Sequence, residues 1–254
     1  MNHKTTTALL VAMLLATLAL PDEARADRRI FAQTYGYATL PQGIKELEHY
    51  ADAGTFHLVD PGDPDGEEEL VVDWKHQLEL EYGITNRLDL GLYQVFRQKP
   101  FQAFRYQGFK VRSRYRFAEE GELPVDVAVY LEAAWYVDVV AIEQRLILAR
   151  RFGTVEIAAN LKVEQEIEDG VLELVLAPMG GLGWHVTDAI ALGVEYHGRT
   201  AFEAGTSSPF THHLGPSASV RARGWYWTVS ALPRLAGDDG RPEVMARSLL
   251  GLLF

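Results

Sequence analysis

Polar and apolar residues alternate along most of this chain, and this two-residue period limits its fold more than any other feature. From Val72 to Tyr82, apolar and aromatic side chains stand at the even positions, while the odd positions carry charged or amide groups such as Asp73 and Glu79. Successive side chains of a β-strand point to opposite faces, whereas helix side chains repeat about every 3.6 residues. The segment is therefore predicted to be a strand with one apolar face and one ionic face.

The same alternation recurs in about twelve segments, most of them longer than the roughly 5–6 residues of an ordinary strand. The clearest segments are 72–82, 109–117, 125–135, 155–163 and 190–199, and weaker ones lie at 43–57, 87–97, 139–151, 171–185, 213–222, 225–235 and 244–254. A tilted strand that crosses a bilayer needs about 9–11 residues. The lengths of these segments therefore suit membrane-spanning strands.

The connections between the segments alternate between short turns and longer polar loops. The short turns lie at 84–86, 151–154, 185–188 and 223–224, and the loops at 58–69, 98–106, 203–212 and 236–242. The connections at 137–139 and 167–170 are short where the scheme predicts loops. Up-and-down outer-membrane barrels are built with short periplasmic turns and longer outer loops. This topology predicts that both chain termini lie on the periplasmic side.

The first 26 residues have the features of a secretory signal peptide. Lys4 precedes the uncharged run 8–20, and Ala24-Arg25-Ala26 provides a small-residue cleavage site. The uncharged run is shorter than the roughly 20 apolar residues that a transmembrane helix needs. We therefore expect residues 1–26 to be removed as a signal peptide and residues 27–254 to form the mature barrel.

Composition and missing motifs argue against several classes of function. The chain has no cysteine, which excludes a disulfide scaffold, a thiolate metal site and a cysteine nucleophile. Its net charge of −11 argues against nonspecific binding to nucleic acid. The motifs H-E-x-x-H and G-x-S-x-G are absent, and the acidic loop 58–69 lacks the full calcium-loop pattern. We therefore expect no enzymatic activity, no cofactor, no bound metal and no nucleic-acid partner.

Aromatic residues gather near the ends of the predicted strands, where aromatic girdles meet the two lipid interfaces of a barrel. The predicted girdle comprises Trp74 and Trp135 at the outer rim and Tyr82, Trp184, Trp225 and Trp227 at the periplasmic rim. The last alternating segment, 244–254, stops on Phe254. The last predicted strand therefore ends in an aromatic side chain.

This C-terminal segment resembles that of Gram-negative outer-membrane β-barrel proteins, whose last strand commonly ends in an aromatic residue read by the assembly machinery. The positions that match the outward side of that pattern are Val244, Ala246, Leu250, Leu252 and Phe254. The resemblance implies that Phe254 is an assembly signal and that the barrel assembly machinery and outer-membrane lipid are partners. In addition, segment 37–48, with Leu40-Pro41-Gln42-Gly43 before an acidic strand, is similar to the start of uncharacterised transporter-like barrels.

A barrel of about twelve strands encloses a narrow lumen lined by the ionic faces of its strands. One segment contributes a basic column of Lys110, Arg112, Arg114 and Arg116. The other predicted lumen charges are Arg145, Arg221, Glu79, Glu81, Asp126, Glu132 and Glu164. Two interpretations stay open: a salt-bridged interior that holds the barrel rigid, or a basic track that guides small anions.

The sequence thus predicts an all-β protein, a closed antiparallel up-and-down transmembrane barrel in the outer membrane of a Gram-negative bacterium. We expect a narrow, porin-like channel or transporter for small solutes, anions among them. One alternative is a non-conducting barrel with a structural or surface-interaction role. A second is a soluble periplasmic β-protein, which would turn Leu78, Val127 and Leu161 into a dry centre.

Overall fold

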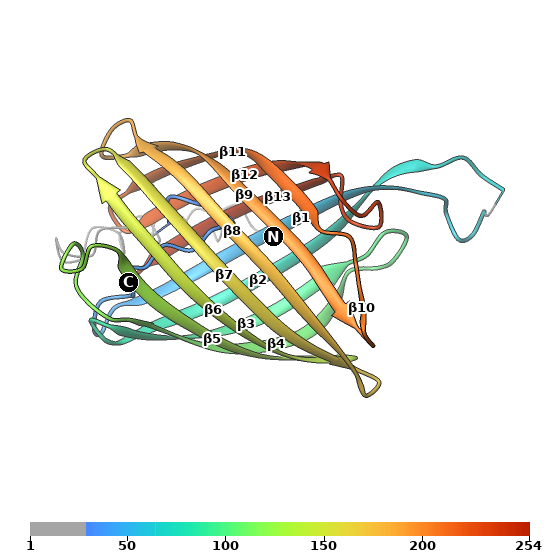
Figure 1. Cartoon of the computed structure of the whole chain (residues 1–254), viewed down its shortest axis with the longest axis horizontal. Helices are drawn as coiled ribbons and strands as arrows, with labels where there is room; N and C mark the ends of the chain where they lie inside the picture. Colours follow the sequence, from blue (N-terminus) through green and yellow to red (C-terminus); the bar gives the residue numbers. More distant parts are fainter. Residues whose placement is uncertain (1–28, 64) are drawn as a thin grey trace, which may run out of the picture.

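A computed structural model describes residues 29–63 and 65–254 as one closed antiparallel barrel (Figure 1). The long strands are β1 (Lys45–Leu58), β2 (Glu69–Thr85), β3 (Leu88–Gln98), β4 (Arg105–Arg116), β5 (Asp126–Tyr136), β6 (Val139–Phe152), β7 (Val155–Glu168), β8 (Val171–His185), β9 (Ile190–Glu203), β11 (Thr211–Ala222), β12 (Trp225–Ala236) and β13 (Val244–Leu253). A two-residue strand, β10 (Thr206–Ser207), extends β9 as a small hairpin. Each long strand pairs with the next, and β13 pairs with β1 to close the ring. The predicted fold class is confirmed.

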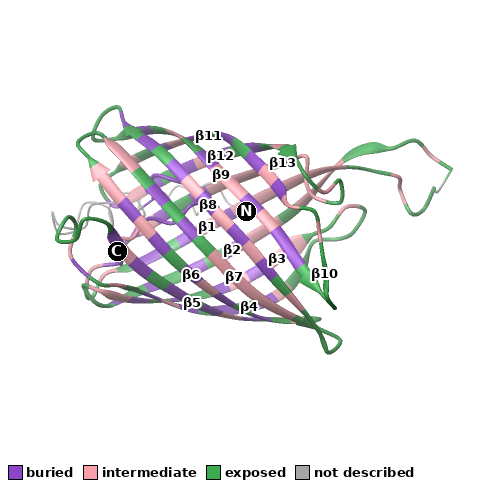
Figure 2. Ribbon diagram, viewed as in Figure 1, coloured by how far each residue is buried: buried purple, intermediate pink, exposed green. Residues whose placement is uncertain are grey.

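The two faces of each strand point as the alternation predicts. On β2, Leu78 and Leu80 are 43% and 48% exposed on the outer surface, whereas Glu79 and Glu81 are fully buried inside the barrel. Alternating bands of exposed and buried residues follow the strands around the wall (Figure 2). Leu161 on β7 also faces outward, with 44% exposure. An apolar exterior around an ionic interior suits a barrel embedded in lipid and contradicts the soluble alternative.

The barrel has two distinct ends. One end carries the short turns and both the start of β1 and the end of β13, and we call it the periplasmic end, following the usual orientation of outer-membrane barrels. The opposite, outer end carries the longer loops after β1, β3, β9 and β12 and two-residue turns after β5 and β7, whereas the nine-residue connection 117–125 lies at the periplasmic end. The β1–β2 hairpin, with the acid-rich loop residues 59–63 and 65–68, projects beyond the outer end (Figure 1). Among the described residues, no helix is long and apolar enough to cross a bilayer.

Residues 29–40 lie inside the barrel rather than in its wall, and we call them the plug segment. They form no strand, yet residues 29–36 are all buried. The sequence pattern gave no prediction for this segment, because it has no two-residue period. The predicted signal peptide, residues 1–26, lies outside the described residues.

Candidate functional site

Side chains of the barrel wall hold the backbone of the plug segment. The carboxylate of Glu195 on β9 accepts hydrogen bonds from the three successive N–H groups of residues 32–34, at 2.8, 2.8 and 2.7 Å. The amide of Asn160 on β7 accepts from the N–H of Tyr35 at 2.7 Å and donates to its carbonyl at 2.9 Å. Buried backbone groups need such partners. The wall therefore supplies the bonds that a coil inside the lumen cannot make with itself.

Glycines on the inner wall make room for the apolar side chains of the plug segment. A Cβ atom added to Gly181 of β8 would lie 2.7 Å from the ring of Phe31, and one on Gly183 would lie 2.5 Å from Ile30. Real side chains do not approach that closely, so with a larger residue at either position the side chain of Phe31 or Ile30 would have to shift. Gly181 and Gly183 thus form a socket for Phe31 and Ile30 on the inner face of β8.

The periplasmic half of the lumen is filled by a buried group of ionic residues, the arginine–carboxylate cluster, formed by Arg112, Arg114, Glu79, Glu81 and Asp89. Nε of Arg112 lies 2.7 Å from Glu79, and the same guanidinium also contacts Glu81 and Asp89. The guanidinium of Arg114 lies 2.9 Å from Asp89. All five side chains are at most 1% exposed. Buried charges require such close compensation.

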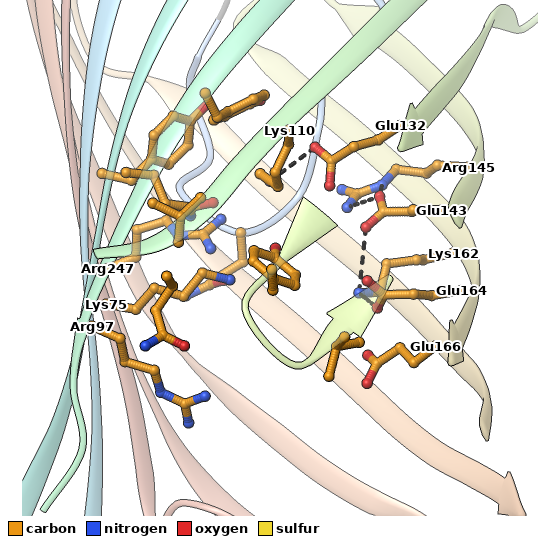
Figure 3. Close-up of a pocket in the computed structure, with 18 of the residues that line it drawn as sticks. Lys75, Arg97, Lys110, Glu132, Glu143, Arg145, Lys162, Glu164, Glu166 and Arg247 are labelled. Carbon is orange, nitrogen blue, oxygen red and sulfur yellow. Dashed lines mark hydrogen bonds and ion pairs between the residues drawn. The ribbon is translucent and has the colours of Figure 1, made fainter. Parts of the chain in front are cut away.

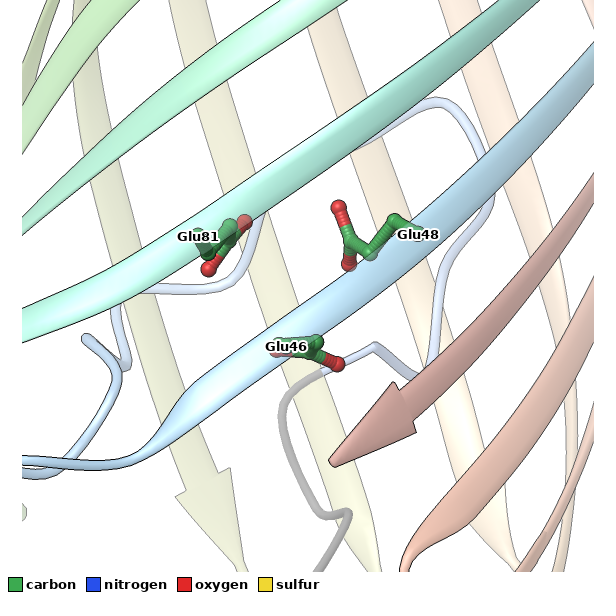
Figure 4. Close-up of side chains that lie close together, drawn as sticks. All are labelled: Glu46, Glu48 and Glu81. Atoms are coloured by element: carbon green, nitrogen blue, oxygen red, sulfur yellow. The ribbon is translucent and has the colours of Figure 1, made fainter. Parts of the chain in front are cut away.

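Arg29 of the plug segment enters a socket of three glutamates beside this cluster. Glu46, Glu48 and Glu81 point toward one another (Figure 4), with carboxylate oxygens within 4.8 Å of each other. Arg29 lies 3.2 Å from Glu48 and donates to the hydroxyl of Tyr50 at 3.0 Å. Burial lowers the pKa of Arg29, but Glu48 and nearby tyrosines raise it by more, so its pKa lies well above the usual range. A permanently charged guanidinium therefore anchors the segment.

The outer half of the lumen holds a cavity of about 490 Å³, which we call the outer chamber (Figure 3). Gln33 and Tyr35 of the plug segment contribute to its lining, and so do Lys99 and Glu168 near the outer strand ends. The ring of Tyr35 is held by cation–π contacts with Arg29 and Arg145, at 4.1 and 4.2 Å from the ring centre. The plug segment therefore forms the floor of a chamber that reaches the outer end.

Two rows of charged residues line opposite sides of the outer chamber. The basic row follows the strand register from β13 to β3 and comprises Arg247, Lys75 and Arg97, with Asp52 of β1 between Arg247 and Lys75 in the register. The acidic row follows the register from β5 to β7 and comprises Glu132, Glu143 and Glu164, with Glu166 next to it on β7. Strand β7 is six strands away from β1 in either direction around the ring. The two rows therefore face each other across the chamber (Figure 3).

Most of these charges are compensated at close range. The acidic row is bridged by Lys110–Glu132 at 2.8 Å, Arg145–Glu143 at 2.7 Å and Lys162–Glu164 at 2.6 Å. In the basic row, Arg247 pairs with Asp52, and Arg97 pairs with Asp73. Within the part of the chain that the structure describes, neither Lys75 nor Glu166 has an ion-pair partner. Each row thus contains one charged residue that forms no ion pair.

The predicted basic column is distributed over three environments. Lys110 lines the outer chamber, Arg112 and Arg114 belong to the arginine–carboxylate cluster, and Arg116 lies at the periplasmic rim. At the rim, Arg116 bonds to the carbonyl of Asn86 at 2.8 Å. The remaining predicted lumen charges are placed as follows: Arg145, Glu132 and Glu164 in the chamber, Glu79 and Glu81 in the cluster, and Asp126 and Arg221 near the periplasmic turns. For Arg112 and Arg114, this placement favours the salt-bridged interpretation.

The predicted girdle residues lie on the outer face of the barrel. Those that are exposed are Trp74, Tyr82, Trp135, Trp184 and Trp227, and Trp225 is half-buried. Trp135 near the outer end stacks on Phe109, with ring centres 5.1 Å apart. Their role in anchoring the barrel to the lipid interfaces stays a prediction.

Phe254 closes the seam between the first and last strands. Its N–H donates to the carbonyl of Lys45 at 2.9 Å, and its own carbonyl accepts from the N–H of Lys45 at 3.0 Å, while its ring is 50% exposed. Deleting Phe254 is expected to lower the yield of assembled barrel, because both the aromatic signal and this bonded pair are lost. The measurement is the fraction of heat-modifiable protein on gels of outer membranes. Phe117→Ala, which removes a similarly exposed ring at the same end, is the control; equal yields for both variants would contradict the assigned role.

Sequence reasoning did not identify Glu195 or Asn160 as plug contacts, or Lys75 and Glu166 as chamber charges. One signal was present: the inward face of β8 carries only apolar or small residues from Val175 to Gly183, whereas the inward faces of β2 and β4 are ionic. An empty stretch of lumen wall indicates that another part of the chain fills the space. The facing of the two rows carries no such signal, because it depends on strand register.

Comparisons with known proteins relate the fold to outer-membrane barrels. It is similar to the COG4313 outer membrane channel from Pseudomonas putida F1, with a TM-score of 0.66 and 11% identity, covering 86% of this chain and 98% of that chain. It is also similar to the translocator domain of autotransporter NalP from Neisseria meningitidis, with a TM-score of 0.53, 13% identity and 98% of each chain covered. For the KdgM porin in complex with disordered oligogalacturonate, the TM-score is 0.52 and the identity 12%, with 83% and 98% covered.

No family model matches the sequence, and no curated protein is similar to it. At identities of 11–13%, the structural likeness establishes the fold and not the solute. The predicted resemblance to Gram-negative outer-membrane β-barrel proteins is confirmed at this level, and the apolar exterior agrees with an outer-membrane location.

Proposed function

We propose that this protein is a narrow outer-membrane channel or transporter for small charged solutes, and that the plug segment closes its periplasmic half in the resting state. The observation that carries the proposal is the outer chamber, a cavity of about 490 Å³ lined by charged side chains inside a membrane barrel. A barrel that served only as a scaffold could fill this space with packed side chains. Instead, the charges face a cavity that reaches the outer end.

Anions are one class of solute that the chamber supports. The basic row offers Lys75, whose ammonium group is uncompensated, together with the guanidinium groups of Arg97 and Arg247. Arg112 and Arg114 offer less, because carboxylates already surround them. The anion-binding side chains are therefore proposed on strands β13 to β3, beside the predicted basic column of β4 rather than on it.

The periplasmic half favours a second candidate function, a barrel that does not conduct. There, the arginine–carboxylate cluster and the plug segment are buried together, and the N–H of Leu40 donates to Asp89 at 2.7 Å. If these contacts never open, the protein acts through its surface or its rigidity alone. The two candidates differ in what happens when the plug segment is removed.

Removing residues 29–36 is expected to raise ion conductance several-fold over that of the wild type. The deletion takes away the floor of the outer chamber, and water can then hydrate the charges that Arg29 now covers. Conductance in planar bilayers and swelling of liposomes in small sugars measure the effect, with heat-modifiable gel mobility showing that the barrel has folded. In the full chain, Glu195→Ala should produce a smaller change in the same direction, because three bonds to the segment are lost.

Glu119→Ala is the matched control, since Glu119 is a rim carboxylate that pairs with Arg116 and Arg87. Its conductance should equal that of the wild type. A folded deletion variant that admits neither ions nor sugars would overturn the channel and leave the non-conducting barrel. Equal, measurable conductance with and without residues 29–36 would keep the channel but remove the closing role of the plug segment.

A further inference from the structure

The outer chamber separates charge across its width. Lys75, Arg97 and Arg247 project from one wall, and Glu164 and Glu166 project from the wall opposite (Figure 3). The separation follows from strand register, because Lys75 and Arg97 are neighbours on β2 and β3, Arg247 lies beyond Asp52 on β13, and both glutamates are on β7. A solute in the chamber therefore meets positive charge on one side and negative charge on the other.

Two members of the rows, Lys75 and Glu166, form no ion pair among the described residues and are therefore available to a solute. Asp52 and Asp73 satisfy Arg247 and Arg97, and Lys162 satisfies Glu164. Among the described residues, Lys75 and Glu166 have no ion-pair partner on their own walls. Lys75, Glu164 and Glu166 line the same cavity of about 490 Å³, so one small solute can lie between the two walls.

We infer that the outer chamber selects small dipolar solutes, which carry one carboxylate and one ammonium group separated by a short chain. The carboxylate binds at Lys75 and Arg97, and the ammonium group binds at Glu166 and Glu164. This inference rests on the proposed channel function and names the solute class of that channel.

A dipolar solute fits both walls, whereas a solute with a single charge leaves one wall unmatched. An anion that binds at Lys75 faces the uncompensated carboxylate of Glu166, and a cation at Glu166 faces the ammonium group of Lys75. Hydrogen bonds between ionised groups are stronger than neutral ones, and two of them also fix the orientation of the solute. The chamber volume of about 490 Å³ accommodates a molecule of a few carbon atoms with its water.

Binding of 4-aminobutyrate to the purified full-length mature barrel in detergent tests this inference directly. The matched probes are 4-hydroxybutyrate, which lacks the ammonium charge, and 4-amino-1-butanol, which lacks the carboxylate. Titration calorimetry at low salt should show 4-aminobutyrate binding about tenfold tighter than either probe, because each probe loses one charge-assisted contact. Lys75→Gln should reduce the preference over 4-amino-1-butanol to about twofold or less, and Glu166→Gln should do the same for the preference over 4-hydroxybutyrate.

A charge swap separates a binding role from a structural one. The double variant Lys75→Glu, Glu166→Lys keeps both charges but exchanges the walls, so it should recover the preference with the solute reversed. Glu67→Gln, in the outer loop, removes an acidic group outside the chamber and should leave binding unchanged. Gel mobility confirms that each variant is folded before binding is measured.

The outcomes distinguish the solute class from the channel function. If 4-hydroxybutyrate binds as tightly as 4-aminobutyrate, the chamber is an anion site and the inference fails; equal binding of 4-amino-1-butanol, or no measurable binding, also overturns it. Dipolar binding without uptake into liposomes supports the site and contradicts the channel. Conductance without any dipolar preference supports the channel and contradicts the site.

Discussion

Replacing Arg112 with alanine is expected to lower the free energy of unfolding by about 3–5 kcal/mol, because the buried carboxylates of Glu79, Glu81 and Asp89 would lose their common cation. The side chains at this point are not exposed to water, so solvent cannot replace the guanidinium without a rearrangement of the lumen. Urea unfolding of the barrel in phospholipid vesicles, followed by tryptophan fluorescence and gel mobility, measures the change.

Arg87→Ala is the matched control for this substitution. Arg87 also forms ion pairs with two carboxylates, Glu119 and Glu122, but all three side chains are 42–55% exposed at the periplasmic turns. Exposed pairs contribute only about 0–1 kcal/mol. If Arg87→Ala and Arg112→Ala cost the same, the arginine–carboxylate cluster is not a stabilising core of the lumen.

The second large loss of stability is expected from a substitution on the outer, lipid-facing surface of the barrel. Leu161→Arg should destabilise the barrel by about 2–4 kcal/mol, because this outward residue lies near the middle of β7, where the arginine would meet the centre of the hydrocarbon. The same unfolding measurement in vesicles applies. Detergent micelles are less suitable, because they adapt to a charged surface more readily than a bilayer does.

Ile167→Arg provides the depth control on the same strand. Ile167 faces outward with 50% exposure, but it lies one residue from the outer end of β7. Near an interface the cost of an arginine falls to about 0–1 kcal/mol. A larger cost at residue 167 than at residue 161 would show that the lipid does not surround the strand at the level we assign.

Most of the fold could be predicted from the sequence because alternation is a local property. Segment 125–135 was predicted as a strand, and β5 runs from Asp126 to Tyr136. Strand ends were less predictable. The predicted segment 155–163 stops short of the end of β7 at Glu168, because residues beyond the hydrocarbon need no apolar outer face and the alternation weakens there.

The candidate site could be predicted only in part, because alternation identifies the face of a residue and not its neighbours. Alternation places Glu132 and Glu164 on the inward faces of their strands. Their alignment with Glu143 depends on the register of β5, β6 and β7, which alternation does not give. Contacts between distant parts of the chain are harder still. Glu195 binds residues 32–34, more than 160 positions away, through backbone groups that carry no sequence signature.

The pairing of β13 with β1 has a consequence for the order in which the molecule is made. The ring becomes complete only when the C-terminal strand reaches the first one, whereas residues 29–40 precede every strand. These residues can bind the inner face of the sheet before β13 pairs with β1. They then need not enter a barrel that has already closed. Pairing of β13 with β1 would then close the barrel around residues 29–40.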